Sequence, residues 1–320
     1  MKEHSLEVHG CHTYDATGAI SPAICLSATF RHPRFGESTG YDYGRVANPT
    51  RESLEKTVAL LERGGRSWAL SSGMAAVQLV FSLLSAGDHV LMSENLYGGT
   101  VRLAEEVFAG YGVTFEYVDV RDLALVGKRM RSETKLVFIE TPSNPMMQIA
   151  DIAALSALAH ENGALLAVDN TFLSPHFQKP LTLGADIVLH SGTKYLCGHN
   201  DVIAGFLVLK DATSAQAKRI ELLAKSAGPN LSALDSWLML RSIKTLGVRV
   251  ERQAENALAI ARWLGTLPEV TEVLYPGLAD HPGYALQQKQ ASGAGGIISF
   301  KVRSAEIAKA ALGRLHLIAF

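Results

Sequence analysis

A lysine flanked by hydroxyl side chains follows one of the apolar segments of this sequence. Lys194 lies in SGTKY (191–195), directly after the apolar run ADIVLH (185–190), so it would stand just beyond the end of a buried strand. An amine in such a place can form a Schiff base with an aldehyde, and the hydroxyls of Ser191 and Thr193 could hold a phosphate beside it. Taken alone, the pattern is also typical of an exposed lysine in a polar loop.

An aspartate closes another apolar run, ALLAVD (164–169). A buried carboxylate is costly unless a cation or a hydrogen-bond donor pairs with it. The protonated ring nitrogen of pyridoxal 5′-phosphate (PLP) is such a cation, and PLP works as an electron sink only while a carboxylate keeps that nitrogen protonated. Asp169 could instead cap a turn, but together with Lys194 it indicates a PLP site in which the lysine carries the cofactor as a Schiff base.

Two further segments could complete such a site. SSGMAA (71–76) opens a predicted helix, where free amide groups and the helix dipole favour a phosphate. NLYGGT (95–100) carries Tyr97, whose ring could stack on a cofactor ring because the glycines behind it allow close approach. Alone, the first pattern is also that of an ordinary helix cap, and Tyr97 could be an ordinary half-buried tyrosine.

The elements that must position these residues follow an alternating pattern. The expected strands cover 88–92, 113–118, 135–140, 164–169, 185–190 and 203–209, and helices are expected at 73–84, 100–109 and 151–161. Short buried strands that alternate with helices are typical of an α/β domain with a mostly parallel, covered sheet. Active sites on such sheets lie beyond the carboxyl ends of the strands, which is where the polar clusters fall.

The pattern differs at both ends of the chain. Residues 1–45 lack a long periodic run and are interpreted as an extended N-terminal arm, and a helix opens at Asn48-Pro49-Thr50. One long helix is predicted from Ser232 to Leu264, with Gly247 as the expected kink. Strands at 270–275 and 296–302 and a helix at 305–313 then begin a smaller α+β domain. We therefore divide the chain into an arm (1–45), a large PLP-binding domain (46–230), and a linking helix with an incomplete C-terminal domain (231–320).

Composition narrows the class of protein. The 320 residues are 48% hydrophobic and carry a net charge of −1, which is ordinary for a globular protein and gives no sign of a nucleic-acid or membrane partner. The N-terminus has no signal-peptide pattern, and no apolar run approaches the roughly 20 residues that a membrane helix needs. Cys11, Cys25 and Cys197 are odd in number and lack metal-ligand spacing, so we expect free thiols, a cytoplasmic location and no metal site.

Taken together, the motifs resemble the Cys/Met-metabolism family of PLP enzymes. That family includes cystathionine γ-synthases, cystathionine β- and γ-lyases, methionine γ-lyases and homoserine-ester sulfhydrylases. The resemblance is carried by YDYGRVANPTRE (41–52), SSGMAA (71–76), NLYGGT (95–100), ETPSNP (140–145), VDNTF (168–172) and HSGTKYLCGHND (190–201). Six motifs in this order make chance agreement negligible. The resemblance implies an aminotransferase-like fold, PLP fold type I.

The resemblance also implies roles for individual residues. Lys194 matches the Schiff-base lysine and proton shuttle, and Asp169 matches the partner of the pyridine nitrogen. Tyr97 resembles the stacking residue, which is also proposed as an acid–base group. Asn144 matches a residue beside the ring hydroxyl.

Binding of the cofactor phosphate is implied to come from two subunits. The family's phosphate cradle matches two backbone amides and two hydroxyls here, those of Gly73, Met74, Ser191 and Thr193. Tyr43 and Arg45 resemble a pair that reaches the phosphate of the neighbouring subunit. The resemblance therefore implies a homodimer or homotetramer with shared active sites, acting on small amino-acid substrates.

The reaction within the family stays open. The favoured activity is γ-replacement on O-acyl-homoserine, by a cystathionine γ-synthase or an O-acyl-homoserine sulfhydrylase, and the alternative is a cystathionine β- or γ-lyase. Gly99 stands where methionine γ-lyases usually carry a cysteine, which disfavours that activity. The other activities share nearly all their site residues, so the motifs do not separate them.

The chain stops within an apolar, strand-like run, LHLIAF (315–320). A terminal strand is normally followed by a polar tail or a docked helix, so we expect the natural protein to continue. The family implies a later arginine that binds the substrate α-carboxylate. A further alternative is therefore a truncated chain that binds PLP without normal activity.

Overall fold

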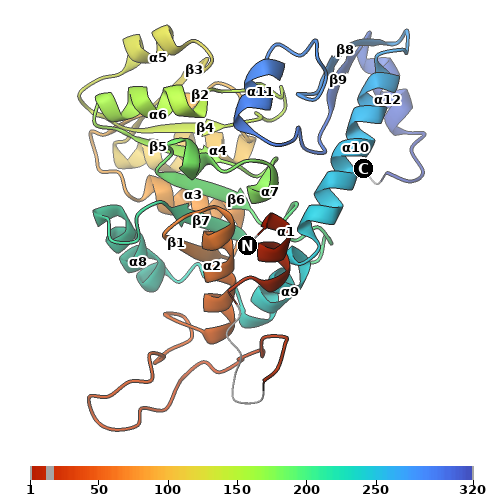
Figure 1. Cartoon of the computed structure of the whole chain (residues 1–320). Coiled ribbons are helices and arrows are strands. Elements are labelled where there is room, and N and C mark those ends of the chain that lie inside the picture. The colour runs from red at the N-terminus through yellow and green to blue at the C-terminus, as the bar shows by residue number, and fades with distance from the viewer. Residues whose placement is uncertain (1, 12–17, 319–320) are drawn as a thin grey trace.

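The computed structural model describes residues 2–11 and 18–318, and its centre is a seven-stranded sheet (Figure 1). The strand order is β1-β7-β6-β5-β4-β2-β3. Strands β2 to β6 pair in parallel, and β7 pairs antiparallel with both β1 and β6. The bounds are β1 Arg66–Leu70, β2 His89–Ser93, β3 Thr114–Val118, β4 Thr134–Glu140, β5 Leu165–Asp169, β6 Ile187–Ser191 and β7 Gly205–Leu209. The predicted α/β class with a mostly parallel sheet is confirmed.

Helices cover both faces of the sheet because its central strands are apolar on both sides. Along β4, Val137 and Ile139 join one hydrophobic cluster, and Leu136 and Phe138 join the other. The first cluster includes residues of α2 (Pro49–Leu61), α5 (Leu123–Arg129), α6 (Ile152–Glu161) and α9 (Ala233–Ile243). The second includes residues of α3 (Gly73–Phe81) and α8 (Ala215–Ala227), with α4 (Gly98–Leu103) packed against it. A strand that is buried on both faces is encoded by an unbroken apolar run.

A smaller sheet follows the long helix α10 (Leu246–Leu264). It consists of β8 (Val270–Leu274) and β9 (Ser299–Val302), which pair antiparallel, with α11 (Tyr284–Gln290) between them in sequence and α12 (Ala305–Leu312) after them.

Short helical segments occur between the strands of the large sheet: η1 (Ala104–Phe108), η2 (Ala109–Tyr111), α7 (Ser174–Phe177) and η3 (Pro180–Leu183). None of the helices within 2–11 and 18–318 is long and apolar enough to cross a membrane. The proposed domain boundaries stay predictions.

The single long helix predicted for 232–264 is wrong. The chain leaves the helical conformation at Thr245, so α9 ends at Ile243 and α10 begins at Leu246. Local hydrogen bonds to the Ser242 carbonyl accompany the break. That carbonyl accepts hydrogen bonds from the Thr245 hydroxyl (3.1 Å) and the Arg249 guanidinium (3.1 Å). The expected kink at Gly247 is therefore wrong by two residues.

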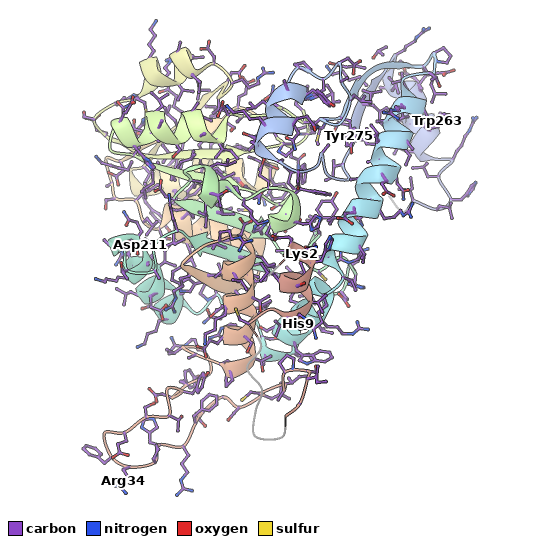
Figure 2. The ribbon with its side chains drawn as sticks, viewed as in Figure 1. Lys2, His9, Arg34, Asp211, Trp263 and Tyr275 are labelled. Carbon is purple, nitrogen blue, oxygen red and sulfur yellow. The ribbon has the colours of Figure 1, made fainter. Side chains whose placement is uncertain are left out.

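The expected extended arm is only partly observed. A short helix, α1 (Glu3–His9), precedes it and buries Leu6 against the large domain. The described part from residue 18 to the start of α2 contains no helix or long strand, and Figure 2 shows Arg34 at its far tip. At the other end, residues 316–318 form bends instead of the expected strand, and 319–320 lie outside the described residues.

The start of β7 approaches the loop between β1 and α3 very closely. A Cβ atom at Gly205 would lie 1.9 Å from the Ser72 carbonyl oxygen, which is a backbone atom and cannot rotate away. Glycine at this position therefore lets the N-terminus of α3 sit over the carboxyl end of the sheet.

We predict that Gly205→Ala destabilises the fold and displaces the α3 N-terminus. Overpacking at such a contact costs about 1–3 kcal/mol or more in the free energy of unfolding, measurable by urea denaturation. The matched control is Gly110→Ala, where a Cβ would meet open space. Equal stability of the two variants would contradict the role of Gly205.

Candidate active site

A cavity of about 320 Å³ opens at the carboxyl ends of β4, β5 and β6. All the predicted site residues except Tyr43 and Arg45 line it: Gly73, Met74, Tyr97, Asn144, Asp169, Ser191, Thr193 and Lys194. The sheet topology brings these residues together from segments spread over more than a hundred positions. The polar residues at the strand ends and at the start of α3 therefore converge on one cavity.

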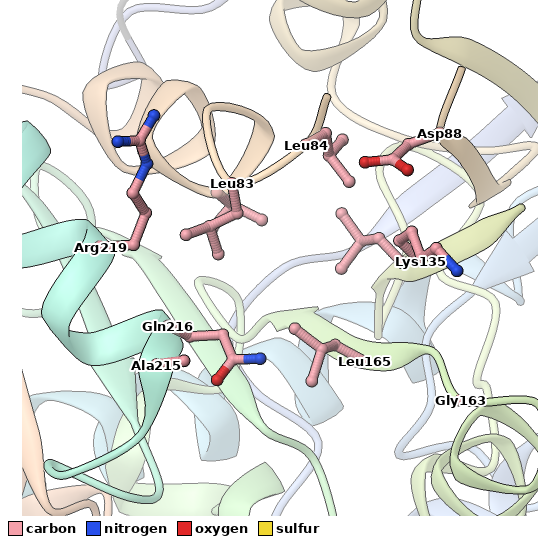
Figure 3. A pocket seen from close by; sticks show the side chains of 11 residues that line it. Leu83, Leu84, Asp88, Lys135, Gly163, Leu165, Ala215, Gln216 and Arg219 are labelled. Carbon is pink, nitrogen blue, oxygen red and sulfur yellow. The ribbon is translucent and has the colours of Figure 1, made fainter. Parts of the chain in front are cut away.

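A second hollow, of about 390 Å³, lies at the opposite edge of the sheet (Figure 3). Its lining includes Asp88, just before β2, and Leu165, at the start of β5. It holds the charged side chains of Lys135 and Arg219 but none of the residues predicted to carry chemistry. Size alone therefore does not identify the site, and the 320 Å³ cavity is the candidate.

Asp169 is held by the threonine two residues later. The Thr171 hydroxyl (2.5 Å) and the Thr171 backbone amide (3.0 Å) both donate to Asp169 Oδ1. The same hydroxyl accepts a hydrogen bond from the Ser191 amide (2.8 Å), which ties β5 to β6. Burial raises the pKa of Asp169, and the Thr171 hydrogen bonds and the charge of His190 oppose that rise. No donor among the described residues reaches Oδ2, which leaves that oxygen for a ligand.

Glu140 stands beside Asp169 at the end of the neighbouring strand. The two are register partners between β4 and β5, and Glu140 is buried. Burial and the charge of Asp169 raise the pKa of Glu140 well above its usual range, while a hydrogen bond from the Tyr97 amide (2.9 Å) opposes the rise. The pair therefore favours one negative charge in place of two, unless a cation enters the cavity.

The N-terminus of α3 forms one wall of the cavity. Ser72 caps the helix by accepting from the Ala75 amide (3.1 Å). The amides of Gly73 and Met74 have no acceptor among the residues described, so they are free to bind an anion. A Cβ at Gly73 would lie 3.0 Å from the Ser191 Cβ, so glycine allows this close packing against β6.

Tyr97 enters the cavity from the segment before α4. Its backbone is fixed by Glu140, while its side chain remains 51% exposed. A Cβ at Gly99 would lie 2.4 Å from the Tyr97 ring and 3.1 Å from the Met74 sulfur. Any larger residue at position 99 would therefore move the Tyr97 ring.

Lys194 lies in a tight turn that follows β6. Its amide donates to the Ser191 carbonyl (3.2 Å), and its own carbonyl accepts from the Gly198 amide (2.7 Å). The Thr193 hydroxyl donates to the Ala204 carbonyl (3.3 Å) and accepts from the Ala204 amide (3.1 Å), which anchors the turn to β7. The backbone is therefore fixed, while the Lys194 side chain is exposed and no described residue binds its amine.

A buried polar network holds the residues next to Asp169 and Ser191. The Glu62 carboxylate accepts from the Asn170 amide group (2.9 Å) and pairs with His190 Nε2 (2.6 Å). Asn170 also donates to the Gln178 carbonyl (2.9 Å). Because Asn170 directly follows Asp169, and His190 precedes Ser191, this network fixes both strand ends from below.

Tyr43 and Arg45 lie outside this cavity. The Arg45 guanidinium stacks 5.3 Å from the centre of the Tyr43 ring and donates to the Lys225 carbonyl at the end of α8. Both side chains are exposed. Within one chain they do not reach the site, and their implied role toward a neighbouring subunit stays a prediction.

The residues present fit PLP. The open Asp169 oxygen suits a protonated ring nitrogen, and the free amides of Gly73 and Met74 suit a phosphate. The exposed amine of Lys194 suits the aldehyde, and the Tyr97 ring can cover the cofactor ring. The Thr193 hydroxyl is the one predicted cradle group that is already bound within the chain.

Sequence reasoning missed several lining residues. Glu140 opens the motif ETPSNP (140–145), but no role was predicted for it. Its position beside Asp169 becomes evident only when β4 and β5 are known to be neighbours. Thr171 was also in a quoted motif, and its position two residues after an aspartate is typical of a turn in which the side chains bond to the backbone. Ile203 and Phe172 line the cavity without any signal of their own.

The fold and this site define a PLP-dependent enzyme, and comparison with known proteins identifies the family. Residues 4–320 match the model of the family described as Cys/Met metabolism PLP-dependent enzyme, and the chain belongs to that family. It is 45% identical to the cystathionine gamma-lyase of Bacillus subtilis over 99% of this chain and 83% of that protein. It is 44% identical to the cystathionine gamma-synthase/O-acetylhomoserine (thiol)-lyase of the same organism, over 90% of this chain and 77% of that protein.

Solved structures agree with this assignment. Cystathionine gamma-lyase from Lactobacillus plantarum, solved with L-serine, matches all of this chain and 84% of its own with a TM-score of 0.97 and 42% identity. The metB protein of Corynebacterium glutamicum matches with the same TM-score and 40% identity, over 100% of this chain and 84% of its own. The predicted PLP fold type I is confirmed.

We predict that Glu140→Gln makes the cofactor-free chain relatively more stable at high pH. The native Glu140 carboxyl, with its raised pKa, still holds a proton at pH values where the unfolded carboxyl, of pKa about 4.3, has lost its own. Native stability therefore falls as pH rises from the unfolded pKa through the raised folded pKa, and glutamine removes that fall. Urea unfolding from about pH 5 to about pH 8 measures the difference.

Glu161→Gln, an exposed carboxylate at the end of α6, is the matched control and should show no such trend. A stability gap between wild type and Glu140→Gln that stays constant with pH would show that Glu140 is ionised normally in the fold.

Proposed function

We propose that this enzyme catalyses γ-replacement on O-acyl-homoserine, joining its carbon skeleton to a thiol or sulfide. One observation supports elimination and replacement chemistry above all: two exposed, unanchored proton carriers, Lys194 and Tyr97, line one cavity above the fixed carboxylate of Asp169. Loss of a γ substituent requires protons to be moved at several carbons of one bound amino acid, so one base alone is insufficient.

The chain's own residues would divide the work as follows. Asp169 Oδ2 would hold the proton of the cofactor's ring nitrogen, and the amides of Gly73 and Met74 would fix its phosphate. When bound, PLP supplies an electron sink for negative charge on the neighbouring amino-acid carbon. The Lys194 amine would carry protons between the substrate carbons, and the Tyr97 hydroxyl would give a proton to the leaving group or accept one from the incoming thiol.

A second candidate is cleavage of cystathionine. It is favoured by the relatives of 45% identity, which are named cystathionine gamma-lyase and cystathionine beta-lyase MetC, both from Bacillus subtilis. The same proton carriers would serve it, since a lyase also removes a proton from the α carbon and expels a sulfur group. The two candidates differ in which substrate the cavity accepts.

We predict that the PLP-loaded chain converts O-acetyl- or O-succinyl-homoserine with cysteine or sulfide more efficiently than it cleaves cystathionine. Steady-state kcat/KM values with product analysis decide this, because replacement gives cystathionine or homocysteine. Lys194→Ala should lose the visible absorption of a lysine-bound cofactor and about 10³-fold or more in activity. Lys210→Ala, outside the cavity, is the matched control.

Each outcome separates the candidates. A higher kcat/KM for cystathionine would favour the lyase, with pyruvate marking β-cleavage and 2-oxobutyrate marking γ-cleavage. No turnover of any of these substrates would contradict both proposals.

We also propose that two copies of the chain share their active sites, in a homodimer or homotetramer within the cytoplasm. Tyr43 and Arg45 lie outside their own cavity, at the end of the arm, which exposes the large apolar side chains of Ile20, Leu26 and Phe35. Such side chains are typical of a surface that a partner covers. The three cysteines are free thiols, as the proposed location requires.

Shared sites predict complementation between two inactive variants. Suppose that Arg45 serves the neighbouring copy. A dimer of one Arg45→Ala chain and one Lys194→Ala chain then has one site with both substitutions and one site with neither. Random mixing of dimers would then restore about a quarter of wild-type activity. Absence of any recovery, with hybrids confirmed by affinity tags, would show that Arg45 serves its own subunit.

A further inference from the structure

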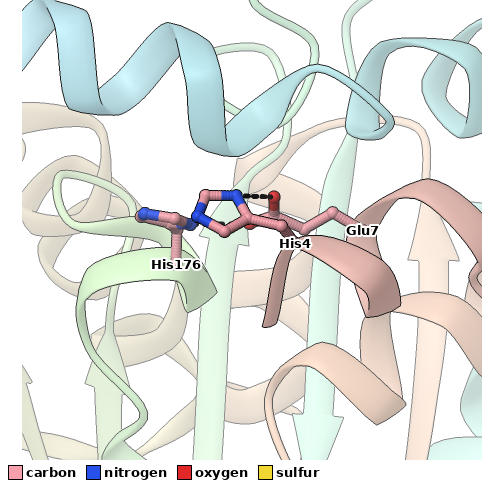
Figure 4. A group of neighbouring side chains, drawn as sticks. All are labelled: His4, Glu7 and His176. Carbon is pink, nitrogen blue, oxygen red and sulfur yellow. Dashed lines mark hydrogen bonds and ion pairs between the residues drawn. The ribbon is translucent and has the colours of Figure 1, made fainter. Parts of the chain in front are cut away.

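Two histidines and two glutamates from three separate elements meet beside the N-terminal helix. Figure 4 shows three of them, His4, Glu7 and His176. His4 and Glu7 lie one turn apart on α1, His176 is in α7, and Glu251 is on α10. Ligand atoms of His4, Glu7 and His176 all lie within 4.8 Å of one another. None of these residues belongs to the active site described above.

The two carboxylates bracket both imidazole rings. Glu7 lies 2.6 Å from His176 Nδ1 and 3.6 Å from His4 Nδ1. Glu251 lies 3.3 Å from His176 Nε2 and 3.4 Å from His4 Nε2. In a tetrahedral zinc centre with bonds near 2.0–2.1 Å, neighbouring ligand atoms are about 3.3 Å apart. Each ring turns one nitrogen toward Glu7 and the other toward Glu251. An ion takes only one nitrogen of an imidazole, so His4, His176 and Glu7 can share one ion while Glu251 holds the opposite ring nitrogens, as outer carboxylates do around zinc-bound histidines.

The chemistry of the three ligands suits a borderline divalent cation. Imidazole nitrogen and carboxylate oxygen are the ligands of His₂Glu zinc sites. The cluster contains no thiolate, which would favour a softer metal, and it has too few oxygens for Ca²⁺ or Mg²⁺. Zn²⁺ is the ion that this donor set fits.

Two residues of the cluster are buried and two are exposed to solvent. Glu7 and His176 have side chains only 2% and 7% exposed, whereas His4 and Glu251 are 57% and 48% exposed. The Gly247 amide donates to Glu7 Oε2 (3.1 Å), which orients the carboxylate from behind as outer-shell groups do in metal sites. An ion could thus enter from solvent onto ligands that are already in place.

A close approach of α10 to α1 makes the cluster possible. A Cβ at Gly247 would lie 2.6 Å from both Glu7 Oε2 and His4 Nδ1. Glycine there leaves the space in which the side chains converge.

We propose that His4, Glu7 and His176 bind Zn²⁺ and so tie α1 to α7, with Glu251 of α10 as the outer partner of both imidazoles. The ligands come from positions 4, 7 and 176, so no spacing motif predicts the site, and the expectation of no metal rested on the cysteines alone. The competing explanation is an ion-pair cluster in which protons, and no metal, neutralise the carboxylates.

The test is titration of the PLP-loaded, metal-free chain with Zn²⁺ by calorimetry. We expect one ion per chain, and a rise in melting temperature with Zn²⁺ because the ion binds only the folded chain. His176→Gln, which removes a ligand, should weaken binding by about 10²-fold or more, and Glu251→Gln, which removes the outer partner, by about 10- to 100-fold. X-ray absorption of the zinc-loaded wild type should show nitrogen and oxygen ligands, with an imidazole signature and no sulfur.

Matched controls lie on the same helices. His9→Gln on α1 and Glu255→Gln on α10 remove the same groups outside the cluster, and should bind Zn²⁺ as the wild type does. Glu251→Gln alters a half-exposed side chain, so it tests the site even where His176→Gln fails to fold. Three results would overturn the proposal: no binding up to about 100 µM Zn²⁺, sulfur ligation, or binding unaffected by Glu251→Gln.

Discussion

The burial of two carboxylates side by side is the constraint on which the rest of the site depends. The register of β4 against β5 places Glu140 directly beside Asp169, and burial raises the pKa of both. Such a pair is unfavourable unless hydrogen bonds or a cation compensate for it. Thr171 and the Tyr97 amide supply the hydrogen bonds. The protonated pyridine ring of PLP would supply the cation, so its binding here would offset the free-energy cost of burying the two carboxylates.

The groups around this pair differ in how firmly they are held. Amides at the start of α3 and the hydroxyl of Thr193 are fixed by the backbone, through close contacts that glycines at 73 and 205 allow. The side chains of Lys194 and Tyr97 extend from fixed backbones but are themselves exposed. If Lys194 and Tyr97 are the proton carriers proposed above, their exposed side chains would reach several carbons of one bound ligand while the fixed groups hold that ligand in place.

The parts of this structure that the sequence predicts are those set by local pattern. The central strands were predictable because burial on both faces requires continuous apolar runs, and the polar residues that end them were predictable with the strands. Strand β1 (Arg66–Leu70) was missed because it begins with two polar residues, and α1 because a helix of seven residues is stabilised mainly by packing of Leu6. The partnership of Glu140 with Asp169 depends on strand register. Contacts between distant segments leave no local signal.

The same reasoning connects the N-terminal helix to the active site. Asp169 and His176 belong to one short segment, and Asn170 between them is bonded to Glu62 and to the Gln178 carbonyl, so the segment behaves as a rigid unit. His176, at the far end of this unit, contacts Glu7 of α1 and Glu251 of α10. Whatever neutralises that cluster, whether a proton or a metal ion, also fixes the segment that presents Asp169 to the cofactor. One hydrogen-bonded segment therefore carries Asp169 at its start and the contact with the N-terminal helix at its end.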